Sequence, residues 1–443
     1  MSGLAFYGYN SSDNEEDVFF LENGQLEVIA GKNFVNANNN GAGVGGSPIV
    51  DGNGADSTKF GGAPVIGFTN SAGDHLVLFN GDDSNNSENL FIFDQQTNTT
   101  WNLEFTSTPG HDNSVGFGGL NPQDFVLYNG DVYFVGTSGT AGGGTKTTLW
   151  TTNGDMSALI PDTFAVGGID GGGSNIPTDN GQMAVLTSNN TLYFNGSGDG
   201  TTDALWSYNP TNGFSAVSRT NGLNPQDMIS ANIGGGSELF FTSGNTLLAY
   251  NGVGGPKAID SGINAQDLTA VTFGSTTDVF FNGDTSANDP QGLKAGLYEI
   301  SKSTIQLVPG SANLDPQDIT ALDGKIYFAG TDGVSNGQIN EGLWVYNPAT
   351  PNVAPTEITA NIEGQPGKTI KLDSANYQLD MDSSDIGTPN PQAQISTDGT
   401  LLYFTATHGS TNQGLFSYNP TTNTVNTHVS GTSGSDAFNL THV

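Results

Sequence analysis

The sequence predicts an all-β fold, a single β-propeller of eight four-stranded blades. A short β-rich run recurs eight times, centred on Phe6, Leu78, Tyr133, Tyr193, Phe240, Phe280, Tyr327 and Tyr403. After a polar loop comes a second run, centred on Phe19, Phe91, Trp150, Trp206, Leu248, Tyr298, Trp344 and Phe416. The period is about 57 residues, which suits one small sheet per repeat, and no long window has the periodicity of a helix.

Each repeat is expected to hold four strands, A to D. In the repeat that contains Tyr327, "QDITAL" is strand A, "KIYFAG" is strand B and "GLWVYN" is strand C. A weaker run such as "IQLVPG" is strand D. Pro follows Asn209, Asn347 and Asn419, which favours a tight turn between strands C and D because Pro presets φ and donates no hydrogen bond.

The two ends of the chain are expected to share a blade. The first repeat begins with strand B, and the last residues, "GSDAFNLTHV" (434–443), resemble a strand A. A C-terminal strand that completes the N-terminal blade would close the ring and remove an exposed edge. Seven blades remain the alternative if the short repeat at 223–260 is not a full blade.

The whole chain, residues 1–443, is expected to be one propeller domain. The longest insertion, residues 348–390, still contains strand-like pieces, "TEITANIEG" and "KTIKLDS". The repeat spacing resumes at "NPQAQIS", so we expect the insertion to lie within blade 7, as an elaborated strand D and loop.

Composition limits the possible partners and location. The net charge is −34, with only 10 Lys and Arg, which excludes nucleic acid and anionic membranes as expected partners. Asp outnumbers Glu by 33 to 11, which favours turns and hard-cation ligation, although an acidic halophilic surface is a competing explanation. There is no Cys, hence neither a disulfide nor a thiol nucleophile.

No signal for membrane insertion is found. No apolar run approaches the length of a membrane span, and the first residues, "MSGLAFYGYNSSDNEED", lack the pattern of a Sec signal peptide. We expect an extracellular or cell-surface protein that is exported without a Sec signal, as in bacterial type I secretion.

One repeat resembles a known family. The stretch 315–347, "DPQDITALDGKIYFAGTDGVSNGQINEGLWVYN", is similar to the repeat of the ELWxxDGT-repeat proteins, found in bacterial secreted and surface proteins. The matching letters are "DITAL", "IYFAGTD" and "EGLW", whereas "DGT" after the Trp is replaced by "YNP" or "TNG". The resemblance implies a propeller and an extracellular setting, and it supplies no catalytic residue.

A recurring motif, "LNPQD", precedes the predicted strand A in several repeats. Its acidic residue recurs at Asp124, Asp227, Asp267, Asp318 and, in a degenerate copy, Asp436. If strand A is innermost, these carboxylates form a ring at the mouth of the central channel that could hold a cation or a cationic group. The alternative is a structural turn in which Asp binds backbone N–H groups or bridges to the next blade.

The loops between strands B and C are candidate Ca²⁺ sites. They combine Asp, Asn and Gly at short spacing, and "DMDSSD" at 380–385 is the densest group of oxygen ligands. The candidate ligands are Asp82, Asp83, Asp199, Asp203, Asp284, Asp289, Asp380, Asp382 and Asp385. None of the loops has the EF-hand spacing, and solvated hairpin loops explain them equally well. In a propeller these loops share one face with the "LNPQD" motifs, so that face should be strongly negative.

Familiar catalytic motifs are absent. The five His residues show neither HxH nor HExxH spacing, which disfavours a zinc site, and no G-x-S-x-G elbow occurs. Two carboxylates that cleave a glycosidic bond need to be adjacent only in space, so this possibility stays open.

Three functions follow from these observations. The first expectation is a non-catalytic, extracellular, acidic propeller for binding, adhesion or surface and matrix assembly, stabilised by Ca²⁺, whose partner is a glycan or a protein surface. The first alternative is a polysaccharide hydrolase or lyase that uses carboxylates on the loop face. The second is self-association into a filament or lattice, which would need divalent ions to bridge the charges.

Overall fold

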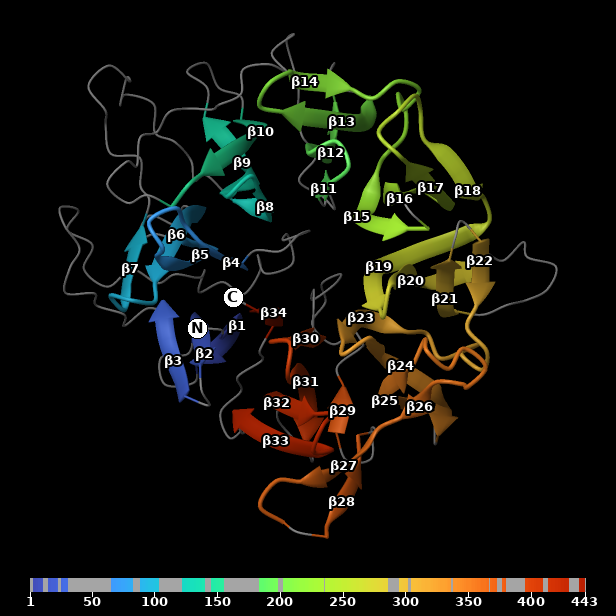
Figure 1. Cartoon of the computed structure of the whole chain (residues 1–443). Coiled ribbons are helices and arrows are strands. Elements are labelled where there is room, and N and C mark those ends of the chain that lie inside the picture. Colours follow the sequence, from blue (N-terminus) through green and yellow to red (C-terminus); the bar gives the residue numbers. More distant parts are fainter. Residues whose placement is uncertain are drawn as a thin grey trace.

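Eight β-sheets stand around a common centre, and no helix occurs in the described residues (Figure 1). The computed structural model describes residues 3–10, 15–22, 25–30, 65–82, 88–102, 122–139, 145–154, 183–197, 202–234, 236–285, 295–301, 304–335, 338–365, 367–372, 377–379, 395–408, 413–429 and 438–442. The fold is therefore the predicted eight-bladed β-propeller, and most blades have four strands.

Each of the first four blades is built outward from an innermost strand. Blade 1 holds β34 (Phe438–His442), β1 (Leu4–Asn10), β2 (Glu15–Glu22) and β3 (Gln25–Ala30). Blade 2 holds β4 (Val65–Thr69), β5 (His75–Asp82), β6 (Glu88–Asp94) and β7 (Thr99–Asn102). Blade 3 holds β8 (Gln123–Tyr128), β9 (Asp131–Gly139) and β10 (Thr145–Thr152). Blade 4 holds β11 (Ala184–Leu186), β12 (Thr191–Ser197), β13 (Asp203–Asn209) and β14 (Gly213–Ala216).

The second half of the ring follows the same order. Blade 5 holds β15 (Gln226–Ile233), β16 (Gly236–Ser243), β17 (Thr246–Tyr250) and β18 (Lys257–Asp260). Blade 6 holds β19 (Ile263–Phe273), β20 (Thr276–Thr285), β21 (Gly296–Ser301) and β22 (Thr304–Leu307). Blade 7 holds β23 (Gln317–Leu322), β24 (Lys325–Ser335), β25 (Gln338–Tyr346) and β26 (Thr356–Glu357). Blade 8 is built on β30 (Ile395–Thr397), β31 (Leu402–His408), β32 (Gln413–Asn419) and β33 (Thr424–Val429).

The blade count is settled by the short repeat. Residues 223–260 supply the complete four-stranded sheet β15 to β18, so the seven-bladed alternative is wrong. This blade is short because β16 and β17 are joined by a tight turn at Gly244. Gly244 has a φ of 55°, a backbone conformation that residues with a side chain rarely adopt.

The ring closes as predicted. Strand β34 pairs antiparallel with β1, with Leu4 opposite His442 and Ala5 opposite Thr441. Leu440 is buried in a cluster that joins blade 1 to blade 8. The N- and C-termini consequently lie near each other in Figure 1.

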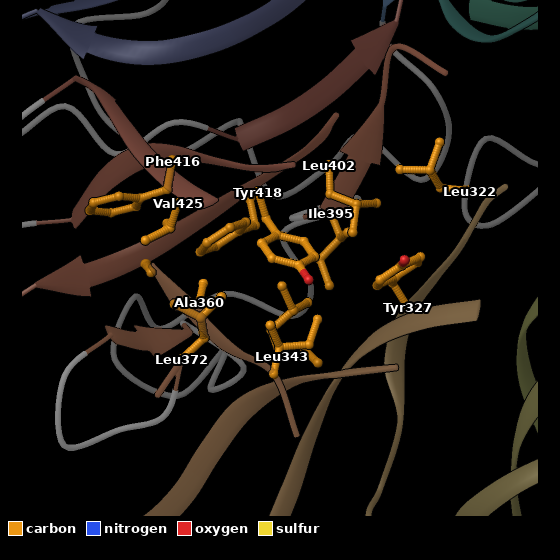
Figure 2. Packing of buried hydrophobic residues seen from close by; sticks show 14 residues of the cluster. Leu322, Tyr327, Leu343, Ala360, Leu372, Ile395, Leu402, Phe416, Tyr418 and Val425 are labelled. Carbon is orange, nitrogen blue, oxygen red and sulfur yellow. The ribbon is translucent and has the colours of Figure 1, made fainter. Parts of the chain in front are cut away.

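Each pair of neighbouring blades shares one hydrophobic cluster. The cluster between blades 7 and 8 contains Tyr327 and Leu343 from one blade and Leu402 and Tyr418 from the other (Figure 2). The recurring aromatic positions of strands B and C fill these clusters, which explains why the sequence repeats them.

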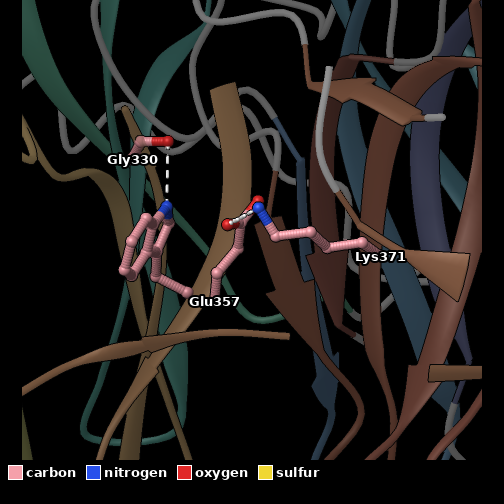
Figure 3. Close-up of polar contacts among 4 residues, drawn as sticks. Gly330, Glu357 and Lys371 are labelled. Carbon is pink, nitrogen blue, oxygen red and sulfur yellow. Dashed lines mark hydrogen bonds and ion pairs between the residues drawn. The ribbon is translucent and has the colours of Figure 1, made fainter. Parts of the chain in front are cut away.

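The insertion between blades 7 and 8 corrects one expectation. Only β26 extends blade 7, whereas three further strands join the sheet of blade 8: β27 (Thr359–Ile362), β28 (Thr369–Lys371) and β29 (Tyr377–Leu379). Strand β27 runs parallel to β33 and buries Ala360, and Leu372 after β28 is also fully buried. The insertion also contacts blade 7 through the ion pair between Lys371 and Glu357 (Figure 3).

Candidate functional site

The acidic residue of the "LNPQD" motif occupies a β-bulge near the start of the innermost strand. Asp124, Asp227, Asp267 and Asp318 have φ values of 54°, 50°, 55° and 52°. In each case the pairing register shifts across the Asp, for example between Gln317 and Thr320. Asp tolerates this left-handed conformation better than most residues, so the repeated Asp has a structural reason in these four copies.

Successive motifs contact one another around the ring. The backbone N–H of Asp318 donates to the Asp267 carboxylate at 3.3 Å. Two residues further along the strand, the Thr269 hydroxyl donates to the Ile319 carbonyl at 2.7 Å. The equivalent Thr320 donates to the Ile395 carbonyl of blade 8 at 3.0 Å. The inner strands of blades 6, 7 and 8 are therefore linked by polar contacts as well as by the hydrophobic clusters.

A buried Asn on strand B binds the first polar residue of the next motif. Asn195 of blade 4 donates to the Asn224 side-chain oxygen of blade 5 at 2.6 Å. Asn282 of blade 6 donates in the same way to the Asp315 carboxylate of blade 7 at 3.1 Å. We call this contact the Asn clamp. It joins the outgoing end of strand B to the segment that leads into the next blade.

The sequence motifs did not predict the Asn clamp, although the sequence contains a signal for it. "FNG" occurs at 79–81, 194–196 and 281–283, and the blade that follows begins with "NPQD" or "DPQD" in all three cases. The first of these motif residues, at position 121, lies outside the described residues.

Electrostatic interaction connects the carboxylates of blades 5, 6 and 7. Burial raises the pKa of Asp227 to about 6, and the negative charge of Asp267 adds to the rise, whereas a hydrogen bond from Thr242 opposes it. Burial also raises the pKa of Asp267, which the Asp318 N–H opposes and the charge of Asp315 increases. Asp267 is exposed, but the protein around it still removes part of the water from its carboxylate, and this desolvation raises the pKa. We call Asp227, Asp267, Asp315 and Asp318 the mouth carboxylates.

Asp124 of blade 3 differs from the other copies. Its side chain is 3% exposed, and neither carboxylate oxygen has a hydrogen-bond partner among the described residues. Burial raises the pKa of Asp124 well above its usual range, which favours the protonated form of this carboxyl. The expected ring of ionised carboxylates is therefore uneven. Its predicted member Asp436 lies outside the described residues.

The predicted Ca²⁺ ligands fall largely outside the described residues. Asp83, Asp199, Asp289, Asp380, Asp382 and Asp385 lie there, and Asp82 is described only as the last residue of β5. Asp203 begins β13, and Asp284 is exposed near the end of β20. No group of three or more His, Cys, Asp or Glu that could hold a metal ion occurs among the residues that the structure describes.

One Ser–His contact has no counterpart among the sequence predictions. The Ser417 hydroxyl and His428 Nε2 lie 2.7 Å apart on β32 and β33. Ser417 is only 3% exposed, and its neighbours are the outer strands of blade 8. A substrate cannot reach this hydroxyl, so the contact does not form the nucleophile and base of an acyl-transfer site.

The described part of the chain contains no helix that is long and apolar enough to cross a membrane.

Comparisons with known proteins identify no family. No family model and no curated protein matches the sequence. Among solved structures, a Mycobacterium tuberculosis puromycin-hydrolysing peptidase is 13% identical, covering 96% of this chain and 53% of its own, with a TM-score of 0.47. A prolyl endopeptidase is 9% identical, covering 84% of this chain and 51% of its own, with a TM-score of 0.43. The β-propeller domain of the Trilobed protease from Pyrococcus furiosus is 9% identical, covering 83% of this chain and 98% of its own, with a TM-score of 0.43.

The expected non-catalytic propeller for adhesion or surface assembly has no counterpart among these structures, several of which bear the names of hydrolytic enzymes, and that expectation is withdrawn. The chain spans about half the length of the two peptidase chains. At such low similarity the matches carry neither an activity nor a residue role over to this chain.

Proposed function

We propose that the chain is a hydrolase, or the propeller part of one, in which the mouth carboxylates cleave glycosidic bonds. The observation that carries this proposal is the pair Asp227 and Asp267. Two interacting carboxyls occur in neighbouring blades, and burial and the Asp267 charge raise the pKa of Asp227 to about 6. An acid that keeps its proton up to about pH 6 beside a second carboxylate is the arrangement that glycoside hydrolysis requires.

The environment of each carboxyl supports a separate role. Asp227, whose pKa is raised to about 6, acts as the general acid that protonates the leaving oxygen. Asp267 accepts the N–H of Asp318, a contact that favours its ionised form, and it acts as the nucleophile or as the base that activates water. The stereochemistry of the product then reports the separation of the two groups in the working enzyme.

The charge of the protein restricts the substrate. With a net charge of −34, the mouth carboxylates lie in a negative field that repels polyanions such as uronic-acid polymers. A neutral or cationic polysaccharide is therefore the proposed substrate, and a lyase that acts on acidic glycans is disfavoured. Such substrates occur outside cells, which agrees with the extracellular location that the resemblance to ELWxxDGT repeats implies.

The experiment is a hydrolysis screen on neutral, amino-sugar and uronic-acid polysaccharides. Wild type should release reducing ends from a neutral or amino-sugar polymer, and both Asp227→Asn and Asp267→Asn should lower kcat by about 100-fold or more. Asn also tolerates a positive φ, so the bulge should persist in both variants. Asp284→Asn, an acid-to-amide change at an exposed position of blade 6, is the matched control. Absence of hydrolysis on every polymer, or equal rates in all variants, would refute the proposal.

Stabilisation by Ca²⁺ stays a prediction. Its test is the unfolding midpoint with and without millimolar Ca²⁺, which should rise if the loops between strands B and C bind the ion.

A further inference from the structure

A buried hydroxyl joins strand C to the end of strand D in two blades. In blade 4 the Leu205 N–H donates to the Thr220 hydroxyl at 3.2 Å, and this hydroxyl donates to the Val217 carbonyl at 2.7 Å. In blade 6 the Ser311 hydroxyl accepts the Leu297 N–H at 3.1 Å and donates to a carbonyl just after strand D at 2.8 Å. Both hydroxyl residues are 0% exposed. We call this contact the hydroxyl bridge, and it satisfies buried backbone groups of both strands.

Blade 7 makes the same contact with backbone atoms instead of a hydroxyl. The Leu343 N–H donates to the Leu372 carbonyl at 2.9 Å, and the Leu372 N–H donates to the Ile358 carbonyl at 2.9 Å. The Ile358 N–H also donates to the Leu343 carbonyl at 2.9 Å, as its counterparts do in blades 4 and 6. Leu372 therefore takes the place of Thr220 and Ser311.

The chain reaches Leu372 only after it has contacted blade 8. Strands β27 and β28 precede Leu372, and β27 pairs with β33, which is strand D of blade 8 (Figure 1). The Asn361 N–H donates to the Asn423 carbonyl at 2.8 Å, and the Glu363 N–H donates to the Val425 carbonyl at 3.0 Å. The start of this segment is thus bonded to blade 8 and its end to blade 7.

Hydrophobic and ionic contacts also hold this segment, which we call the clasp and which comprises residues 359–365 and 367–372. Leu372 is 0% exposed and lies in the hydrophobic cluster that blades 7 and 8 share (Figure 2). Lys371 forms the ion pair with Glu357 of blade 7 (Figure 3). Burial and charge therefore support the same connection as the backbone hydrogen bonds.

We propose that the clasp couples blade 7 to blade 8, so that the contacts at its two ends form and break together. Release from blade 7 leaves the buried N–H of Leu343 without its acceptor, and the short hairpin that carries this acceptor also holds β33. In blades 4 and 6, Thr220 and Ser311 follow strand D within a few residues, so their bridges stay inside one blade. The clasp does not depend on the proposed hydrolysis, because none of the mouth carboxylates belongs to it.

The test is native-state hydrogen exchange of wild type and Asn423→Gly. In wild type the amides of Leu343, Asn361 and Glu363 should have protection factors that agree within about threefold, as expected of one cooperative unit. Asn423 directly precedes β33 with a φ of 53°, and its side chain donates to the Thr359 carbonyl at 3.0 Å. Gly adopts this φ and removes the contact, so all three amides should exchange about fivefold faster in the variant.

Asn98→Gly is the matched control. Asn98 occupies the corresponding turn of blade 2 with a φ of 52°, and its side chain donates to Glu27 of blade 1 at 2.7 Å. This variant loses a contact between two other blades, so the amides of the clasp and of Leu343 should exchange as in wild type. The Leu205 amide of blade 4 is the reference for the rest of the ring and should be unchanged in both variants.

Three results would overturn the coupling. Faster exchange of Asn361 and Glu363 alone in Asn423→Gly, with Leu343 unchanged, would mean that the two ends of the clasp open separately. An equal change at Leu205 would mean that the variant loosens the whole ring rather than the seam between blades 7 and 8. Faster exchange of Leu343 in Asn98→Gly would mean that any contact between blades has this effect.

Discussion

The Asp318 backbone N–H donates a 3.3 Å hydrogen bond to the carboxylate of Asp267, its counterpart in the preceding blade. Both residues have a positive φ and sit in the same bulge of successive innermost strands. The motif therefore shapes the entry to each blade and also places one acidic side chain beside the next. A repeat that serves the fold in this way supplies a row of interacting carboxylates.

The positive φ of Asp318 in the bulge limits which residues are tolerated at this position. Asn and Gly adopt a positive φ readily, so Asp318→Asn and Asp318→Gly should change the free energy of unfolding little. Asp318→Val should cost at least about 1–2 kcal/mol, because a β-branched residue is strained there. Urea unfolding of the three variants checks this. Equal stability of the Val and Asn variants would show that the backbone conformation is not what selects Asp.

The raised pKa of Asp227 predicts that this residue lowers stability at neutral pH. Its folded pKa of about 6 exceeds the unfolded value of 3.8, so its contribution to stability is fully present below pH 3.8 and is lost as pH rises through 6. Asp227→Asn should therefore stabilise the protein at pH 7 by about 1–3 kcal/mol and have little effect at pH 4. Denaturant titrations at both pH values measure the difference. A variant that is less stable at pH 7 would contradict the assignment.

The Asn clamp should be one of the stronger polar contacts between blades. Asn195→Ala leaves Asn224 without its buried donor and should destabilise the protein by about 1–3 kcal/mol. The exposed turn residue Asn212, changed to Ala in the same blade, is the control and should cost far less. In a double-mutant cycle, Asn195→Ala and Asn224→Ala should be clearly non-additive. Additive losses would mean that the two side chains are not coupled.

Acid should weaken blade 8 through His428. Burial lowers the pKa of His428 and the charge of Glu363 partly offsets this, so the folded state favours the neutral ring. The neutral His428 ring therefore contributes fully to the stability of the folded protein above pH 6.5, the usual His pKa. This contribution is lost as pH falls below that value. His428→Gln should flatten the decline in unfolding midpoint between pH 7 and 5. Thermal unfolding across that interval measures the effect, and an unchanged slope would exclude His428 as its source.

The architecture could be predicted from the sequence because each blade repeats the same short pattern of strands. Alternating strands, recurring aromatic positions such as Tyr327 and Trp344, and a spare strand at the C-terminus predict the blades and the closure. The prediction for the insertion is wrong because short strands such as β27 carry little pattern of their own. The partner of β27 is chosen by the burial of Ala360 and Leu372 between blades.

The repeated position of the Asp was visible in the sequence, but its surroundings were not. The motif spacing places Asp227, Asp267 and Asp318 in matching bulges of three successive innermost strands. The raised pKa values of Asp227 and Asp267 depend on burial and on charges in the neighbouring blade, which a linear sequence does not contain. The Asn clamp is likewise visible only in the structure, which brings Asn195 to Asn224 and Asn282 to Asp315.

The central claim, that the mouth carboxylates hydrolyse glycans, is tested most directly by kcat/KM as a function of pH. On a neutral or amino-sugar polysaccharide, activity should fall as pH rises through about 6, because Asp227 then loses the proton that it donates. Asp227→Asn should remain folded and lose about 100-fold or more of the activity. A rate that is constant from pH 5 to 8, or an Asp227→Asn variant as active as wild type, would contradict the account.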